Sequence, residues 1–310
     1  MLFNHGNNPV INTPKFNRRK SNNEFCELSP PELNEETIYL HRKTFERRSK
    51  MEIESSTRQS YLEASNNPLA KELLFKLMYC NEDEPCNSMA CPLCNMKNRL
   101  HYINTTLKHY YTYDDELLFV TYIAYPHEHF DDDPSSIDVN KIKDQLRCYL
   151  KNAGINEIAI GCFEVDFDIN RNSWIPHIHF VIRNVKQLKL KALRKSINAS
   201  HLHTRENITN RPLHIQSVYN LIGALCYIYK FMPQARISKR RLELKTWGTY
   251  IKRTAKQWKT HSWKTRIRNE HAVNMLLMMD QFTMKDFEFR FGVRRNKRGI
   301  SLIDKSRSAE

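Results

Sequence analysis

Between residues 117 and 231 the sequence alternates strand and helix patterns in the order β-α-β-β-α-β, followed by one more helix. Strands are marked by runs of β-branched and aromatic residues, and helices by apolar residues that recur every three or four positions. A chain with this order can form an antiparallel sheet with its helices on one face, the split βαβ arrangement. We therefore predict an α+β fold, with segments at 117–123, 139–152, 157–168, 174–183, 185–199, 212–218 and 219–231.

The second strand of the central hairpin carries two histidines on one face. It runs from Trp174 to Ile182 and is rich in β-branched and aromatic residues. Side chains two positions apart on a strand point to the same side, so His177 and His179 stand next to each other. Two neighbouring imidazoles on a rigid strand are half of a metal site. The alternative is a pair of surface imidazoles that bind nothing.

The first strand of that hairpin supplies carboxylates. If the turn is centred near Arg171, opposite residue numbers sum to about 342, which places Glu164 near Ile178, between the two histidines. A bulge of one residue would bring Asp166 there instead. Two imidazoles and a carboxylate suit a divalent cation with open positions, and we predict Mg²⁺ or Mn²⁺. An open position can bind and polarise a phosphate oxygen.

A second His-x-His pair, His201 and His203, lies in the polar stretch of residues 198–210. It has no apolar flanks, so we interpret it as loop chemistry or a DNA contact. The first pair is favoured as the metal site because it lies on a strand and faces an acidic partner strand.

The last helix of the series, residues 219–231, offers a nucleophile on its polar side. Tyr227 faces away from the apolar side, with Lys230 one turn further on and Gly223 one turn before it, which leaves room for a bulky substrate. A phenol is a poor nucleophile at its ordinary pKa, and a nearby cation and a metal-polarised phosphate both assist it. The alternatives are that Tyr227 only half-buries its ring, or that Tyr219 is the nucleophile.

The charge of the chain predicts an anionic partner. Its 310 residues carry a formal net charge of +15, with a pI near 9.4. This excess of positive charge suits a nucleic acid or an acidic membrane surface. No run of residues has the length of a transmembrane helix, and residues 1–20 lack the apolar segment of a signal peptide. We therefore expect a cytoplasmic protein that binds nucleic acid and no membrane.

Composition divides the chain into four parts. Residues 1–35 are rich in Asn, Pro, Lys and Arg and predict a flexible basic arm, and residues 36–112 predict a helical region. Residues 113–235 contain the α+β core. Residues 236–310 hold twenty Lys and Arg against seven Asp and Glu and predict a basic, helical DNA-binding tail. Tryptophans within it could stack on unpaired bases, namely Trp247, Trp258 and Trp263.

Four of the eight cysteines cluster ahead of the core, at Cys80, Cys86, Cys91 and Cys94. In a reducing compartment, cysteines are thiols or metal ligands rather than disulfides. The Cys-x2-Cys pair is a typical zinc ligand pair, and four thiolates can surround a structural zinc ion. A cluster of free thiols is the alternative, and His101 could replace Cys80.

Taken in order, these motifs resemble the HUH superfamily of single-strand endonucleases, and within it the rolling-circle replication initiator proteins of plasmids. The stretch Leu118–Thr121 resembles the apolar strand ending in Thr that forms the family's first motif. Pro176–His179, with the upstream Glu164, resembles its His–hydrophobic–His motif, and Tyr227–Lys230 resembles its Tyr-x-x-Lys motif. Cys91–Cys94, read Cys-Pro-Leu-Cys, is similar to an element that many plasmid initiators carry before the first motif.

This resemblance spans residues 80–232 and implies a ferredoxin-like HUH endonuclease core with extra N- and C-terminal helices. It implies that the protein nicks and religates single-stranded or hairpin origin DNA through a 5′-phosphotyrosine at Tyr227. The released 3′-OH would prime a polymerase, and a host helicase and polymerase would be partners. Tyr229 is two positions from Tyr227 rather than four, so the resemblance favours a one-tyrosine enzyme.

The resemblance also assigns the metal ligands. His177 and His179, with Glu164 as the third ligand, would hold a divalent metal on the scissile phosphate, and Lys230 would assist the tyrosine. Asp166 stays open as an alternative third ligand.

Two other functions share parts of this pattern. An HUH transposase or mobilisation relaxase would use the same site. A non-catalytic, zinc-stapled nucleic-acid-binding module would use the same sheet, but RNA-recognition domains with that sheet order carry stacking aromatics on their exposed strands. Here the same face carries Glu164, His177 and His179, which favours the enzyme.

Overall fold

The computed structural model describes residues 33–34, 48–111, 116–130, 133–183, 185–202, 210–230, 234–247, 253–267, 269–296 and 299–303. Of residues 238–247, 253–262 and 269, only the backbone is described. The predicted basic arm, residues 1–35, therefore lies outside the described part of the chain except for Leu33 and Asn34.

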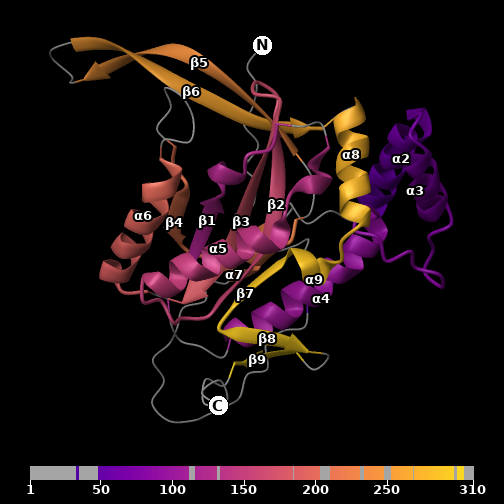
Figure 1. The fold of residues 1–310 in the computed structure, drawn as a ribbon, viewed down its shortest axis with the longest axis horizontal. Coiled ribbons are helices and arrows are strands. Elements are labelled where there is room, and N and C mark those ends of the chain that lie inside the picture. Colours follow the sequence, from indigo (N-terminus) through magenta and orange to yellow (C-terminus); the bar gives the residue numbers. More distant parts are fainter. Residues whose placement is uncertain are drawn as a thin grey trace, which may run out of the picture. The chain divides into compact units, whose positions relative to one another are not determined.

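The described strands form a seven-stranded sheet and a separate hairpin (Figure 1). The order in the large sheet is β4-β1-β3-β2-β5-β6, and β7 also pairs with β2. All its pairings are antiparallel except that of β2 with β5, so the predicted antiparallel sheet is in fact mixed. The strands are β1 (Leu117–Ile123), β2 (Ala159–Asp168), β3 (Ser173–Arg183), β4 (Leu213–Ser217), β5 (Gln234–Trp247), β6 (Arg253–Arg266) and β7 (Glu288–Phe291), with β8 (Val293–Asn296) and β9 (Gly299–Leu302) forming the hairpin.

Each helix and strand predicted between residues 117 and 231 is present, so the α+β class is confirmed. The periodic apolar residues that mark these elements are the ones that become buried. The helix α5 is capped by the Asp138 side chain, which accepts a hydrogen bond from the backbone N–H of Lys141, and it ends before Gly154 at φ +69°. The α-helices are α2 (Arg48–Ala64), α3 (Pro68–Met78), α4 (Pro92–Tyr111), α5 (Val139–Asn152), α6 (Gln187–His201), α7 (Leu221–Ile228), α8 (Asn269–Asp280) and α9 (Met284–Phe287).

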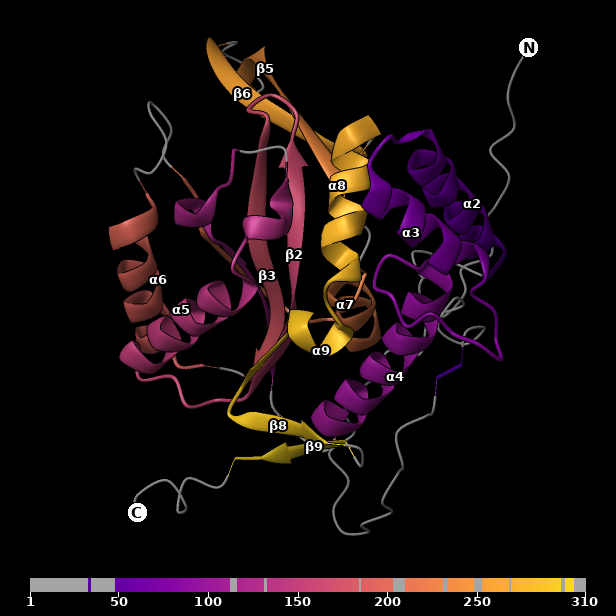
Figure 2. The same ribbon diagram turned by 45° about the vertical axis from the view of Figure 1, so that its right-hand side comes forward.

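Helices cover both faces of the sheet, whereas the sequence predicted helices on one face (Figure 2). On one face, the Tyr122 hydroxyl of β1 lies 3.2 Å from Oε1 of Gln145 in α5 and 3.0 Å from Nε2 of His201 in α6. On the opposite face, the ring of Tyr227 in α7 lies against His179 of β3. The helix α4 packs behind α7, where Arg99 donates to a backbone carbonyl of α7. The two histidines therefore lie between the sheet and α7.

The predicted helical tail of residues 236–310 is wrong for most of its length. It contains the long hairpin of β5 and β6, and β7 returns to pair with β2 beside Cys162. A strand rich in Lys and Arg does not alternate apolar with polar residues, so the sequence pattern does not identify it as a strand. The helix predicted near residues 269–281 is present as α8. The tail is thus part of the sheet rather than a separate appendage.

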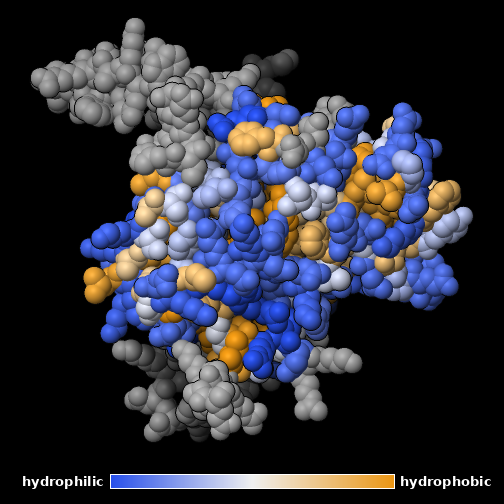
Figure 3. All heavy atoms as spheres, in the orientation of Figure 1, coloured by the Kyte–Doolittle hydropathy of each residue, from blue (hydrophilic) through white to orange (hydrophobic). Residues whose placement is uncertain are grey.

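The face of the molecule in Figure 3 is mainly hydrophilic, with apolar residues in separated groups. Among the helices that the structure describes, none is both long enough and apolar enough to cross a membrane.

Gly161 permits the close approach of β2 to β3 beside the histidines. A Cβ at this position would lie 2.0 Å from the carbonyl oxygen of His179, and that backbone atom cannot move without opening the strand pair. We expect Gly161→Ala to lower the free energy of unfolding by about 1–3 kcal/mol, measured by urea denaturation. Gly154→Ala is the matched control, because a Cβ there meets nothing within 4 Å and costs only backbone strain. Equal losses in the two variants would contradict the steric explanation.

Candidate active site

His177 and His179 lie on β3 with 3% and 4% of their surface exposed. The strand register places Glu164 of β2 directly opposite His177, so the sequence-based position opposite Ile178 is wrong by one residue. The Nε2 atoms of His177 and His179 lie 3.1 and 3.4 Å from the same carboxylate oxygen, Oε2 of Glu164. Paired side chains on adjacent strands approach each other this closely because they share a face of the sheet. The three predicted ligands therefore meet at one point.

Hydrogen bonds on the far side of each ring orient the two imidazoles. Nδ1 of His177 lies 3.2 Å from the carbonyl oxygen of Ile175, which can only accept, so Nδ1 carries the proton. Nδ1 of His179 lies 2.8 Å from Oγ1 of Thr121, which can accept its proton. In this arrangement both Nε2 atoms face the same carboxylate oxygen, and the contact of His179 with Glu164, at 3.4 Å, is the longer of the two. A shared cation satisfies such a set of donor atoms, because it replaces repulsion by coordination.

The ionisation of Glu164 favours binding of a cation at this point. Burial raises the pKa of Glu164, but its hydrogen bonds with His177 and then His179 lower the pKa further, so the pKa ends well below its ordinary value. Burial lowers the pKa of His179, and the hydrogen bond with Glu164 offsets this effect only in part. For His177, burial acts in the same direction, but the charges of Asp166 and Glu164 outweigh it and raise the pKa. A cation at this point would compete with a proton for Nε2 of His177.

Asp166, the alternative third ligand, has a different role. It lies opposite Ile175 and is 1% exposed, and its carboxylate pairs with Arg236 of β5 at 3.1 Å and Lys264 of β6 at 3.2 Å. The geometry therefore favours Glu164 as the ligand. Sequence reasoning missed both cations, because the parallel register of β5 against β2 and the pairing of β6 with β5 bring them to the site.

Tyr227 reaches the site from α7. Its ring centroid lies 5.0 Å from that of His179, in an edge-on arrangement. It lines a cavity of about 200 Å³ together with both histidines and the cations Arg236 and Lys264. Burial raises the pKa of Tyr227, and the charge of Lys264 partly offsets this effect. A nearby ammonium group and a candidate metal site are features that can assist a phenol as a nucleophile.

Lys230 is not among the described residues that line the cavity of Tyr227. The helix α7 ends at Ile228, and Lys230 follows in a turn in which its backbone N–H donates to the carbonyl of Tyr227 at 3.2 Å. Among the described residues that line the cavity, Lys264 is the lysine, and its charge acts on Tyr227. Lys264 therefore replaces Lys230 as the candidate cation beside the phenol.

The other two tyrosines of this region are placed differently. Tyr219 precedes α7 and is 97% exposed, and it lines a neighbouring hollow instead of the cavity. Tyr229 is fully buried, which is consistent with the prediction that its side chain points away from the site.

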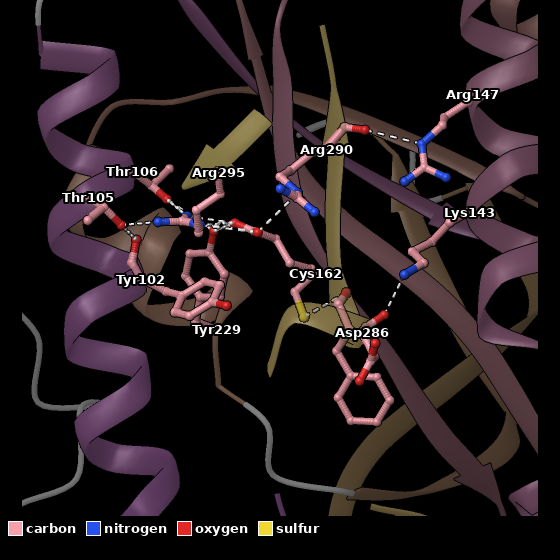
Figure 4. Close-up of polar contacts among 12 residues, drawn as sticks. Tyr102, Thr105, Thr106, Lys143, Arg147, Cys162, Tyr229, Asp286, Arg290 and Arg295 are labelled. Atoms are coloured by element: carbon pink, nitrogen blue, oxygen red, sulfur yellow. Dashed lines mark hydrogen bonds and ion pairs between the residues drawn. The ribbon is translucent and has the colours of Figure 1, made fainter. Parts of the chain in front are cut away.

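Tyr229 belongs to a buried polar network between α4, α7 and the C-terminal strands (Figure 4). Its hydroxyl lies 3.1 Å from that of Thr106 in α4 and donates to Glu288 of β7 at 3.5 Å. The side chain of Glu288 has no exposed surface, and it accepts hydrogen bonds from Arg295 at 2.6 and 2.9 Å and lies 3.2 Å from Nε of Arg290. Because the carboxylate is compensated by two guanidinium groups, this network can be buried. It fixes the end of α7 and, with it, the placement of Tyr227.

The four clustered cysteines also meet. The Sγ atom of Cys94 lies 3.5 Å from that of Cys80 and 3.7 Å from that of Cys86, and the Cys80–Cys91 distance is 3.7 Å. Hydrogen bonds from Cys86 and then Cys91 lower the pKa of Cys94 to about 2. His101, the alternative to Cys80, is exposed on α4 and is not in the cluster. In the described part of the chain, this cluster and Glu164–His177–His179 are the groups that could hold a metal ion.

His201, the described member of the second histidine pair, belongs to the core. His201 is buried between α5, α6 and β1, where burial lowers its pKa to about 4. Its interpretation as a loop residue or a DNA contact is therefore wrong, because α6 extends to it and packs it into the core. His203 lies outside the described residues.

Comparison with protein-family models, curated proteins and solved structures gives no match for this chain.

Proposed function

We propose that this protein is a metal-dependent endonuclease and strand transferase of the HUH type, acting on single-stranded DNA as a rolling-circle replication initiator. The observation that carries the proposal is the position of Tyr227, beside His179 and in the same cavity as His177 and His179, the two histidines of the cluster that Glu164 completes. The excess of positive charge on the chain supports an anionic substrate.

The sheet supports the same proposal. The pairings that join β4, β1, β3 and β2 in that order are antiparallel, and α5 and α6 connect β1 to β2 and β3 to β4. This is the strand order of the ferredoxin-like split βαβ unit. The strands β5, β6 and β7 would be additions to that unit, and two of them bring Arg236 and Lys264 to the cavity.

Glu164, His177 and His179 would hold Mg²⁺ or Mn²⁺, which would act there as a Lewis acid on a phosphate oxygen. The fit rests on the convergence of three donor atoms, one each from Glu164, His177 and His179, which all lie within 4.8 Å of one another. Arg236 and Lys264 would bind the phosphate and stabilise negative charge that develops on it.

Tyr227 would attack the phosphorus as the phenol loses its proton, which forms a bond between its oxygen and the phosphorus. The bond from phosphorus to the 3′ oxygen of the neighbouring nucleotide breaks, and that oxygen takes up a proton. The products are a 5′-phosphotyrosine and a free 3′-OH that can prime a polymerase. Attack of a 3′-OH on the phosphotyrosine reverses the reaction and joins strands.

The proposal is tested by incubating the protein with a labelled random-sequence library of single-stranded DNA and Mn²⁺. We expect a covalent protein–DNA adduct on a denaturing gel, which is lost when the metal is chelated. Binding of the library without any adduct would support a non-catalytic nucleic-acid-binding module instead.

We also propose that the four cysteines hold a structural zinc ion at the start of α4. Tetrahedral zinc with Zn–S bonds of about 2.3 Å needs sulfur atoms about 3.8 Å apart, close to the observed 3.5–3.7 Å.

We expect one zinc per chain by elemental analysis. Cys80→Ser should weaken zinc binding at least about tenfold in chelator competition, since it removes one of four thiolates. Cys148→Ser, which changes an exposed thiol outside the cluster, should leave zinc binding unchanged. Zinc-free wild-type protein with an unchanged melting temperature would contradict this proposal.

A further inference from the structure

A second hollow, of about 500 Å³, adjoins the cavity that contains the histidines. The two share Thr121 and Tyr227 in their walls, so Tyr227 stands at the boundary between them. The wall of the second hollow comes from β1, the end of β4, the segment that follows it and the first turns of α7. Gly223 of α7, though buried, is among the residues that line it.

The chemistry of the two spaces differs sharply. Both candidate cations, Arg236 and Lys264, are among the described residues that line the cavity. Among the described residues that line the second hollow, none has a charged side chain. Its lining instead offers the exposed ring of Tyr219 and the exposed polar side chains of Gln216 and Ser217. A phosphate therefore fits the cavity, and a flat, uncharged group with hydrogen-bonding edges fits the hollow.

Tyr219 is the unusual residue of this surface. An aromatic side chain that is 97% exposed gains nothing from burial in the folded chain. Exposed aromatic rings beside a cationic site are the means by which proteins hold unpaired bases, because every base has a π-face that can stack. Gln216 lies opposite Phe119 in the β1–β4 register, so its amide is carried on the same sheet face as the site and can reach a base edge.

We propose that this hollow binds the unpaired base of the nucleotide that adjoins the cleaved phosphate, with Tyr219 stacking on the base. The inference rests on the proposed function, since the phosphate that orients this nucleotide is the one bound at the metal cluster. A base held in this way cannot remain paired, so the hollow selects single-stranded over duplex DNA. Tyr219 is then a binding residue and not an alternative nucleophile.

The test measures binding of a fluorescein-labelled random 12-nucleotide single strand by anisotropy, without divalent metal, so that it needs no cleavage. Tyr219→Ala is expected to weaken binding about 10- to 100-fold, which is the effect of losing one stacked base. Tyr219→Phe keeps the ring and should restore the affinity to within about threefold. Binding of a blunt duplex of the same length should be the same in all three proteins.

Tyr79→Ala is the matched control, because Tyr79 is also a largely exposed tyrosine, at 72%, and lies at the end of α3 outside both spaces. It should bind the single strand as the wild type does. Wild-type affinity in Tyr219→Ala, or an equal loss for single-stranded and duplex DNA, would overturn the inference.

The adduct assay separates this inference from the proposed function. If the wild type forms adducts while Tyr219→Ala binds DNA normally, the subsite is wrong and the nuclease stands. If the wild type forms no adduct but Tyr219→Ala loses single-strand affinity, the subsite stands and the nuclease is wrong. Loss of adducts in Tyr219→Phe would identify Tyr219 as the nucleophile and overturn its role as a stacking residue.

Discussion

Replacing Tyr227 with phenylalanine is expected to abolish the covalent DNA adduct, with a decrease of at least about 10³-fold in the rate of strand cleavage. The substitution removes only the hydroxyl that would bond to phosphorus, while the ring that packs 5.0 Å from His179 is retained. Loss of a nucleophile removes the covalent route entirely, so the effect should be on the chemical step and not on DNA binding. Single-turnover cleavage and anisotropy on the same preparation measure the two separately.

Tyr229→Phe is the control for this prediction, since it removes a hydroxyl two residues away on the same segment. That hydroxyl is bonded to Thr106 and Glu288, so its loss should cost about 1 kcal/mol of stability and leave adduct formation intact. Adducts at the wild-type level in Tyr227→Phe would show that another residue is the nucleophile.

Replacing His177 with alanine should abolish both metal binding at the cluster and strand cleavage. Among the described residues three protein donors converge there, and the remaining pair, Glu164 and His179, would be too few to hold Mn²⁺ against water. We expect Mn²⁺ affinity, measured by calorimetry, to fall by more than about 100-fold, and cleavage to fall below detection. Affinity for single-stranded DNA should change by no more than about threefold, because Arg236 and Lys264 remain.

His214→Ala is the matched control for the metal site. His214 lines the same cavity but does not belong to the cluster of donor atoms, so Mn²⁺ affinity should be unchanged. Retained cleavage in His177→Ala would exclude this cluster as the catalytic metal site, and equal loss of Mn²⁺ affinity in the two variants would show that the ligand set is wrong.

The role of Lys264 illustrates where local sequence patterns stop being informative. The interval between Asp166 and Lys264 is 98 residues, and no periodicity connects them. Their contact follows from two registers, that of β5 against β2 and that of β6 against β5. The sequence instead pointed to Lys230, which is close to Tyr227 along the chain but follows the end of a shorter helix than predicted.

By itself, the sequence determined the elements between residues 117 and 231 and the pair of histidines on one strand face, because both depend on local periodicity. It also brought Glu164 to within one residue of its true partner, since a short hairpin turn restricts the register. The tertiary structure alone decided that Glu164 rather than Asp166 meets the histidines, that Tyr227 reaches His179, and that a basic hairpin completes the cavity. These contacts depend on how separate elements pack against one sheet, and that packing is fixed by long-range burial and strand pairing that no single segment encodes.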